Sequence, residues 1–148
     1  MANSLEEEEG KIMTQQYDFG QFGPEHFENI KEGIRLFNKE KFWECHEILE
    51  DHWLEARGDN ARNVYWAVIQ VAAANIHVRD NNLIGAQGLI KKAKEKLDRC
   101  EKFKVETSLL QQLDWNNLKR IVRAIPEESQ LEHFEDIYKF KFPPIYEG

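Results

Sequence analysis

The stretch Ala61–Val78, ARNVYWAVIQVAAANIHV, decides the fold of this chain because it is apolar on nearly every side of a helix. A surface helix carries one apolar stripe, whereas a helix that is apolar all round is surrounded by other elements. We therefore expect this segment to be the central helix of the fold. Its alanines would let neighbouring helices approach closely.

The segments on either side also follow a helical period, with apolar residues three or four positions apart. They are separated by turn signals such as Gly58-Asp59-Asn60 and Arg79-Asp80-Asn81-Asn82, and no strand alternation, hairpin signal or internal repeat is found. The sequence therefore predicts an all-α, single-domain antiparallel bundle of about five to six helices with short connections. The expected helices begin at Pro24, Lys41, Ala61, Leu83, about Leu113 and Leu131.

The chain divides by composition into a tail and a domain. Its 148 residues are enough for one domain with a real core and short for two. Residues 1–22 contain four consecutive glutamates and show no sustained period, which predicts an acidic, mobile N-terminal tail. The helical bundle is expected over residues 23–148.

Charge and hydropathy exclude several classes of protein. The net charge of −7 argues against nucleic acid as a partner, because phosphate binding depends on clustered Lys and Arg. No apolar run approaches the roughly 18 residues of a membrane span. Met1–Gly10 has no apolar core that could serve as a signal peptide. With only two cysteines, Cys45 and Cys100, a disulfide framework is not indicated, so we expect a cytoplasmic protein.

Five polar or amphipathic residues stand within the apolar pattern of the second and third helices: His46, Glu50, Trp53, Gln70 and His77. Burying a histidine, a carboxylate and an amide costs free energy unless each finds a partner. Such a set indicates either a hydrogen-bonded core network or a binding site.

Helical phase refines this set on the second helix. At 100° per residue, His46 lies at the edge of the buried stripe and Glu50 lies one turn further on, so the two side chains can touch. Glu47 falls outside the stripe. The stretch His46-Glu47-x-x-Glu50 resembles the zinc-protease motif H-E-x-x-H, but its fifth position is glutamate and not histidine. The next histidine on this helix, His52, points to the opposite side of the buried stripe from His46. A metalloprotease is therefore not predicted.

On the third helix Trp66, Gln70 and His77 share one face. If this helix packs antiparallel to the second, His46, Glu50 and His77 could converge and form a first shell for zinc, iron or manganese. The alternative is a metal-free network or a simple ligand pocket. The four tryptophans are interpreted as core residues, and Trp53 and Trp66 could also wall a pocket. The complete candidate pocket comprises His46, Glu47, Glu50, Trp53, Trp66, Gln70 and His77.

The segments FNKEKFWECHEILEDHW (37–53), IQVAAANIH (69–77) and NLIGA (82–86) together resemble the small prokaryotic domain-of-unknown-function family 309. The resemblance extends over about Ile34 to Leu97. It departs from the family pattern at Ala67 and Asn81, where glycine and a Gly-Asn pair are usual. The resemblance implies an all-helical cytoplasmic protein in which His46, Glu50, Trp53, Gln70 and His77 define the family. It implies no particular activity.

Two functional hypotheses follow. The first is a binding or enzymatic pocket between the second and third helices for a small ligand or a divalent metal, with metal-assisted hydrolysis as the default chemistry and Glu47 or Glu50 as the base. The second is a structural or protein-interaction module whose polar residues form a buried hydrogen-bond network. A homodimer formed through an apolar helix face is compatible with either hypothesis. The sequence identifies no substrate and does not decide whether the protein is an enzyme.

Overall fold

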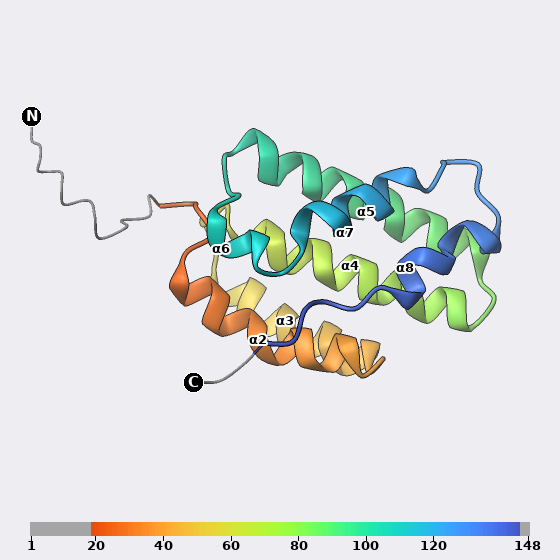
Figure 1. Ribbon diagram of the computed structural model, residues 1–148, viewed down its shortest axis with the longest axis horizontal. Helices are drawn as coiled ribbons and strands as arrows, with labels where there is room; N and C mark the ends of the chain where they lie inside the picture. The colour runs from red at the N-terminus through yellow and green to blue at the C-terminus, as the bar shows by residue number, and fades with distance from the viewer. Residues whose placement is uncertain (1–18, 146–148) are drawn as a thin grey trace, which may run out of the picture.

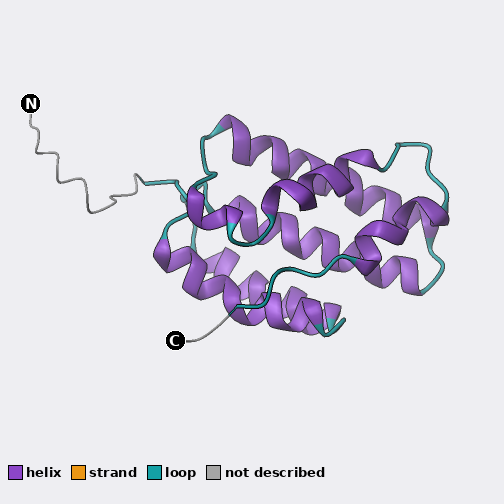
Figure 2. Cartoon of the chain, in the orientation of Figure 1, coloured by secondary structure: helices purple, strands orange, loops and turns teal. Residues whose placement is uncertain are grey.

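The computed structural model describes residues 19–145, and within this range the chain forms seven α-helices, one short 3-10 helix and no strand (Figure 2). The predicted all-α class is confirmed. The α-helices outnumber the expected five to six by the short α6 (Ser108–Gln111), while the short helix expected from Leu131 is observed as α8 (Glu135–Lys139). The 3-10 helix η1 (Leu131–Phe134) leads directly into α8. None of the described helices is both long enough and apolar enough to span a bilayer.

Helix α4 (Arg62–Arg79) is the central element, as its sequence predicts, and eleven of its eighteen residues are buried. It packs mainly against α5 (Leu83–Lys102) and α3 (Phe42–Glu55), which lie on opposite sides of it in Figure 1. Helix α2 (Pro24–Asn38) covers α3, and α7 (Trp115–Ala124) covers α5. The result is a layered bundle in which α4 contacts solvent over only a small part of its surface.

The connections on both sides of α4 are short and have identifiable chemistry. After α3, Gly58 adopts a left-handed backbone conformation with φ of +80°, which a residue with a side chain would resist. The side chain of Asp59 then accepts a hydrogen bond from the backbone N–H of Ala61. Between α4 and α5, the Asn82 side chain caps α5 by accepting a hydrogen bond from the N–H of Gly85. Both turns hold neighbouring helices antiparallel.

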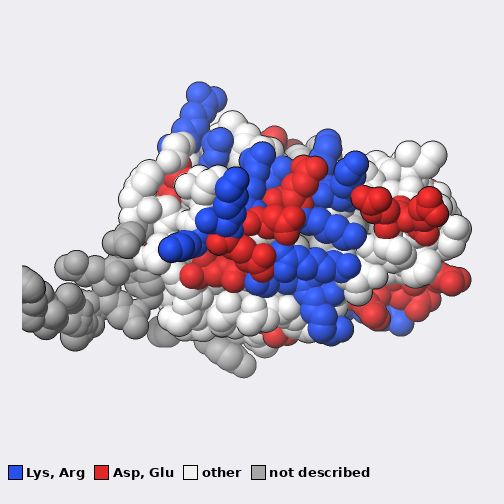
Figure 3. All heavy atoms as spheres, turned by 90° about the horizontal axis from the view of Figure 1, so that it is seen from above, with Lys and Arg blue, Asp and Glu red and all other residues white. Residues whose placement is uncertain are grey.

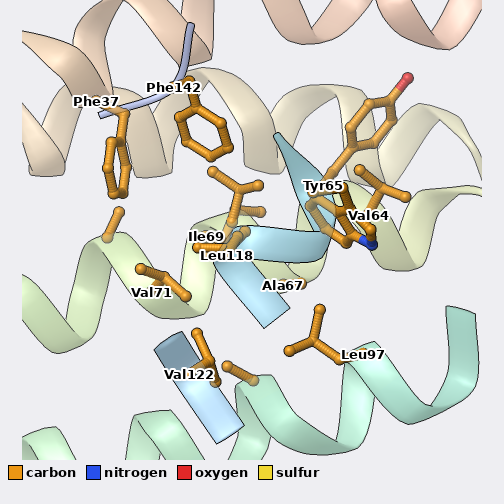
Figure 4. Packing of buried hydrophobic residues seen from close by; sticks show 14 of the residues in the cluster. Phe37, Val64, Tyr65, Ala67, Ile69, Val71, Leu97, Leu118, Val122 and Phe142 are labelled. Carbon is orange, nitrogen blue, oxygen red and sulfur yellow. The ribbon is translucent and has the colours of Figure 1, made fainter. Parts of the chain in front are cut away.

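The hydrophobic core gathers around α4, with side chains from α2, α5, α7 and the C-terminal segment pointing toward it (Figure 4). Phe142 of the C-terminal segment packs edge-on against Phe37 of α2, with ring centres 5.1 Å apart. The Asn38 side chain fixes this segment by donating to the backbone carbonyl of Phe142 and accepting from its N–H. The last residues of the described chain are thus part of the fold.

The predicted acidic tail lies mostly outside the described residues, which begin at Phe19. Phe22, assigned to that tail from the sequence, is fully buried and packs with Phe27. Its N–H donates to the Val105 carbonyl, and its own carbonyl accepts from the Thr107 hydroxyl. The folded domain therefore includes Phe22 and starts before residue 23. The sequence indicated Phe22 only as a residue through which the tail could dock, because its backbone partners Val105 and Thr107 are more than 80 residues away.

The exposed face of α5 and α7 carries interleaved positive and negative side chains (Figure 3). Arg123 binds Glu101 and Asp98, and Lys119 bridges Glu101 and Glu106. Hydrogen bonds from Arg123 and Lys119 lower the pKa of Glu101 to about 2. Arg123 and Lys119 are therefore each paired with acidic residues of this face.

Candidate functional site

Helices α3 and α4 bring together the two tryptophans that were predicted to wall a pocket. The rings of Trp53 and Trp66 lie with their centres 4.8 Å apart and their planes tilted by 56°. This contact sets the register of the antiparallel pair, because it places the end of α3 beside the beginning of α4. Side chains one and two turns before Trp53 then face those one and two turns after Trp66.

A pocket of about 230 Å³ opens at this junction, where α5 forms a third wall. Five of the seven candidate residues from the sequence line it: His46, Glu50, Trp53, Trp66 and Gln70. The other lining residues are Ile69, Ala73, Leu89 and Lys92. The pocket is therefore apolar on its floor and polar on the sides supplied by α3 and α4.

Three polar atoms of the pocket residues are buried and form no hydrogen bond with any part of the chain that the structure describes: Nδ1 of His46, Nε1 of Trp53 and Oε1 of Gln70. The whole Gln70 residue is only 5% exposed. A buried donor or acceptor without a partner costs roughly 1–3 kcal/mol. These three atoms therefore take no part in a hydrogen-bond network among the described residues, although their side chains belong to residues that line the pocket.

His46 is held in place by a residue that the sequence analysis interpreted differently. Trp43, expected in the core, is 59% exposed, and its ring stacks on the His46 imidazole at 5.2 Å with planes 14° apart. The two residues are three positions apart on α3, so they lie on neighbouring parts of the same helix surface. Trp43 thus covers the outer face of His46 and restricts its ring orientation. Only Trp115 among the four tryptophans is fully buried.

Glu47 and His77 do not line this pocket. Glu47 is exposed on α3, as its helical phase outside the buried stripe indicates. The antiparallel register places Ala73 opposite His46, so His77 lies about one turn further along α4. Its Nδ1 contacts the Asn82 side chain at 3.2 Å, and its ring lies where a side chain on Gly85 would be. His77 therefore packs over the α4–α5 turn.

The structure does not bring His46, Glu50 and His77 together as the predicted metal triad. Between residues 19 and 145, no group of three or more His, Cys, Asp or Glu side chains is placed to hold a metal ion. The reason is the register of α3 on α4, which separates His77 from the other two by a helical turn. The residues at the pocket do not fit a resident zinc, iron or manganese ion, which needs at least three protein ligands in most sites.

Both cysteines are buried free thiols. Burial raises the pKa of the Cys45 thiol to about 12, and that of the Cys100 thiol to about 12 as well. A thiol with such a pKa is protonated at neutral pH and is a poor nucleophile. Cys45 lies next to His46 in sequence but contributes packing to the core.

The part of the pocket that sequence reasoning missed comes from α5. Leu89 and Lys92 line the pocket from that helix. Their spacing of three residues places them on one side of α5, but local helical periodicity does not reveal how α5 is rotated relative to α3 and α4. A basic residue three positions after an apolar one is common on solvent-facing helices, so Lys92 carried no distinctive signal.

The fold and pocket define a helical-bundle domain with a tryptophan-walled pocket between three helices. Residues 30–89 of this chain match the model of the family described as "Domain of unknown function (DUF309)". The predicted resemblance is thus confirmed over this stretch, which runs from α2 into α5 and contains every pocket residue except Lys92. No curated protein matches the chain, and no solved structure matches it.

Proposed function

We propose that this protein binds a small organic molecule in the pocket between α3, α4 and α5. The observation that supports this most directly is a pocket of about 230 Å³ whose lining combines apolar side chains with the polar residues His46, Gln70 and Lys92. Ligand pockets combine an apolar lining with a few fixed polar groups, and this volume suits a ligand smaller than a typical drug molecule. A metal ion and metal-assisted hydrolysis are not part of the proposal, because His46 and Glu50 lack a third ligand.

The indole N–H of Trp53 provides a direct signal for testing the proposal. We expect at least one of four small probes (phenol, benzamide, benzoate and imidazole) to shift its NMR resonance saturably in ¹⁵N-labelled protein. The resonance is assigned by its disappearance in Trp53→Phe. Because the Trp53 indole lines the pocket, a ligand bound there changes the environment of this N–H.

Filling the pocket should abolish this response. Ala73 lines the pocket from α4, and Ala73→Leu adds three carbon atoms there while replacing one strong helix former by another. We expect at least a tenfold loss of probe affinity, measured by the same titration. The matched control is Ala124→Leu, the same change on the exposed last residue of α7. Unchanged probe binding in Ala73→Leu, with the fold intact by circular dichroism, would overturn the proposal.

A second variant separates a ligand site from a structural network. Gln70→Leu replaces a buried acceptor that has no partner by an apolar group of similar size. Its expected effect on the free energy of unfolding is a gain of up to about 1 kcal/mol, together with weaker probe binding. Urea denaturation measures the first effect and the NMR titration the second.

The control for Gln70→Leu is Asn63→Leu on the same helix. Asn63 is equally buried, but its side-chain amide donates to the Asn60 carbonyl at 2.9 Å, so its replacement should destabilise the fold by about 1 kcal/mol. A loss of stability in Gln70→Leu as large as that in Asn63→Leu would favour the structural role. The cytoplasmic location, the homodimer and the lack of nucleic-acid binding expected from the sequence stay predictions.

A further inference from the structure

The two tryptophans of the pocket are surrounded by positively charged side chains. The Arg62 guanidinium lies over the Trp53 ring at 4.4 Å, and the Lys96 ammonium lies over the Trp66 ring at 4.1 Å. Arg99 approaches the Trp66 ring at 5.8 Å. Cations stabilise the faces of indole rings, so these contacts are favourable in themselves. They place positive charge beside the two tryptophans, while Arg62 and Arg99 themselves line a neighbouring hollow that shares Trp66 with the pocket.

Three of the basic residues follow one face of α5. Lys92, Lys96 and Arg99 are separated by four and three positions, which stacks them along the helix, and Lys92 lines the pocket. Burial, together with the charges of Arg99 and Lys92, lowers the pKa of Lys96. Like charges held this close repel one another, and an anion placed among them would relieve that repulsion.

Acidic side chains do not balance this charge. Glu50 lines the pocket from α3, and Glu95 is 3.9 Å from the Lys96 ammonium. Among residues 19–145, Lys92, Arg62 and Arg99 form no ion pair. The nearby Asp59 carboxylate is already bound by His26 at 2.7 Å. Four cations therefore face two carboxylates, in a chain whose net charge is −7.

The polar groups that line the pocket also favour an anionic ligand. The Trp53 indole N–H can only donate a hydrogen bond, and the Lys92 ammonium likewise only donates. Of these two donors, the Trp53 N–H is enclosed by the chain, whereas Lys92 is exposed and can reach the oxygens of a carboxylate, for which charge-assisted hydrogen bonds are the strongest available. Ile69 and Leu89 provide the surface for an apolar body attached to that group.

We infer that the ligand of this pocket is a small organic anion, whose carboxylate or similar group is bound by Lys92 while its apolar body contacts Ile69 and Leu89. This inference rests on the proposed function and specifies its ligand class. The positive charge of Lys92 attracts and orients the anion, and the apolar floor distinguishes an organic anion from an inorganic one.

The test compares benzoate with benzamide, which has nearly the same shape and no charge. The affinity of each is measured from the Trp53 indole resonance in the full chain. We expect benzoate to bind at least fivefold more tightly than benzamide, and its affinity alone to fall as sodium chloride is raised. Inorganic phosphate should give no saturable shift, because it has no apolar body.

The variant Lys92→Gln removes one charge at the pocket and should weaken benzoate binding by about fivefold, with benzamide binding unchanged. Its control, Lys91→Gln, makes the same change on the neighbouring exposed residue, which lines a different hollow. This control should alter neither affinity by more than about twofold.

Three results would overturn the inference. Equal binding of benzoate and benzamide, or equal effects of Lys92→Gln on both, would show that the pocket does not select charge, while the proposed ligand pocket would stand. Phosphate binding as tightly as benzoate, with the same dependence on Lys92, would replace the organic anion by an inorganic one. If no probe shifts the Trp53 resonance more in the wild type than in Ala73→Leu, the inference and the proposed function both fail.

Discussion

Replacing Trp115 with alanine is expected to lower the free energy of unfolding by about 3–5 kcal/mol. Trp115 is the first residue of α7 and is fully buried, and its ring is among the largest enclosed side chains of the described core. Small domains are commonly stable by only about 5–15 kcal/mol, so this loss would remove a large part of the total. The cost combines the lost burial of the ring with the cavity left behind.

The indole N–H of Trp115 adds a polar contribution, since it donates to the Glu106 carboxylate at 3.1 Å. Trp115→Phe retains most of the ring and loses this bond. Glu106 keeps its two contacts with the Lys119 ammonium and is not left unpaired, so we expect a smaller loss of about 1–2 kcal/mol. The difference between the two variants measures the packing of the ring that Trp115→Phe retains.

The matched control is Trp43→Ala, because Trp43 is 59% exposed and its removal should cost less than about 1 kcal/mol. Urea denaturation followed by circular dichroism suits this series, since tryptophan fluorescence would change with each substitution. Similar losses for Trp43→Ala and Trp115→Ala would contradict the core position of Trp115.

The central helix of the fold could be predicted from the sequence because the residues of α4 are apolar on nearly every side of the helix. A helix that is apolar on nearly all sides can only be stable when other helices surround it, and Ala61–Val78 departs from the observed α4 by one residue at each end. The predicted pairing of His46 with Glu50, and of Trp66 with Gln70, likewise depended on local helical geometry alone. These pairs line one pocket in the structure.

What the sequence could not predict depends on how separate helices are placed against one another. The convergence of His77 with His46 required a particular register of α3 on α4, and the Trp53–Trp66 contact sets a different one. The contribution of Lys92 required the rotation of α5 about its axis. Trp43 was assigned to the core by residue type, whereas its phase on α3 places it on the surface beside His46.

The close packing of α2 on α3 leads to the second prediction of a large effect. Gly33 of α2 is buried, and a Cβ atom placed there would lie 2.5 Å from Cγ and Cδ2 of Leu49. Leu49 is itself fully buried. Gly33→Ala should therefore destabilise the fold by about 1–2 kcal/mol, because overpacking outweighs the gain in helix propensity of about 1 kcal/mol.

Leu49→Ala alone should cost about 3–4 kcal/mol, since it leaves a cavity at the α2–α3 contact. It also removes all three Leu49 atoms that the added Cβ at position 33 would meet. In the double variant Gly33→Ala/Leu49→Ala, the new methyl group enters the vacated space and no longer clashes. We expect the double variant to be no less stable than Leu49→Ala, so the two effects should fall short of additivity by about 2 kcal/mol.

Urea denaturation of the two single variants, the double variant and the wild type gives this coupling energy. Gly88→Ala on α5 serves as the control, because nothing lies within 4 Å of a Cβ at that exposed position. There the same substitution should stabilise the fold by about 0.5–1 kcal/mol through helix propensity alone. A stabilising Gly33→Ala, or additive effects at the two positions, would mean that Leu49 moves aside easily and that α2 and α3 do not require glycine at their contact.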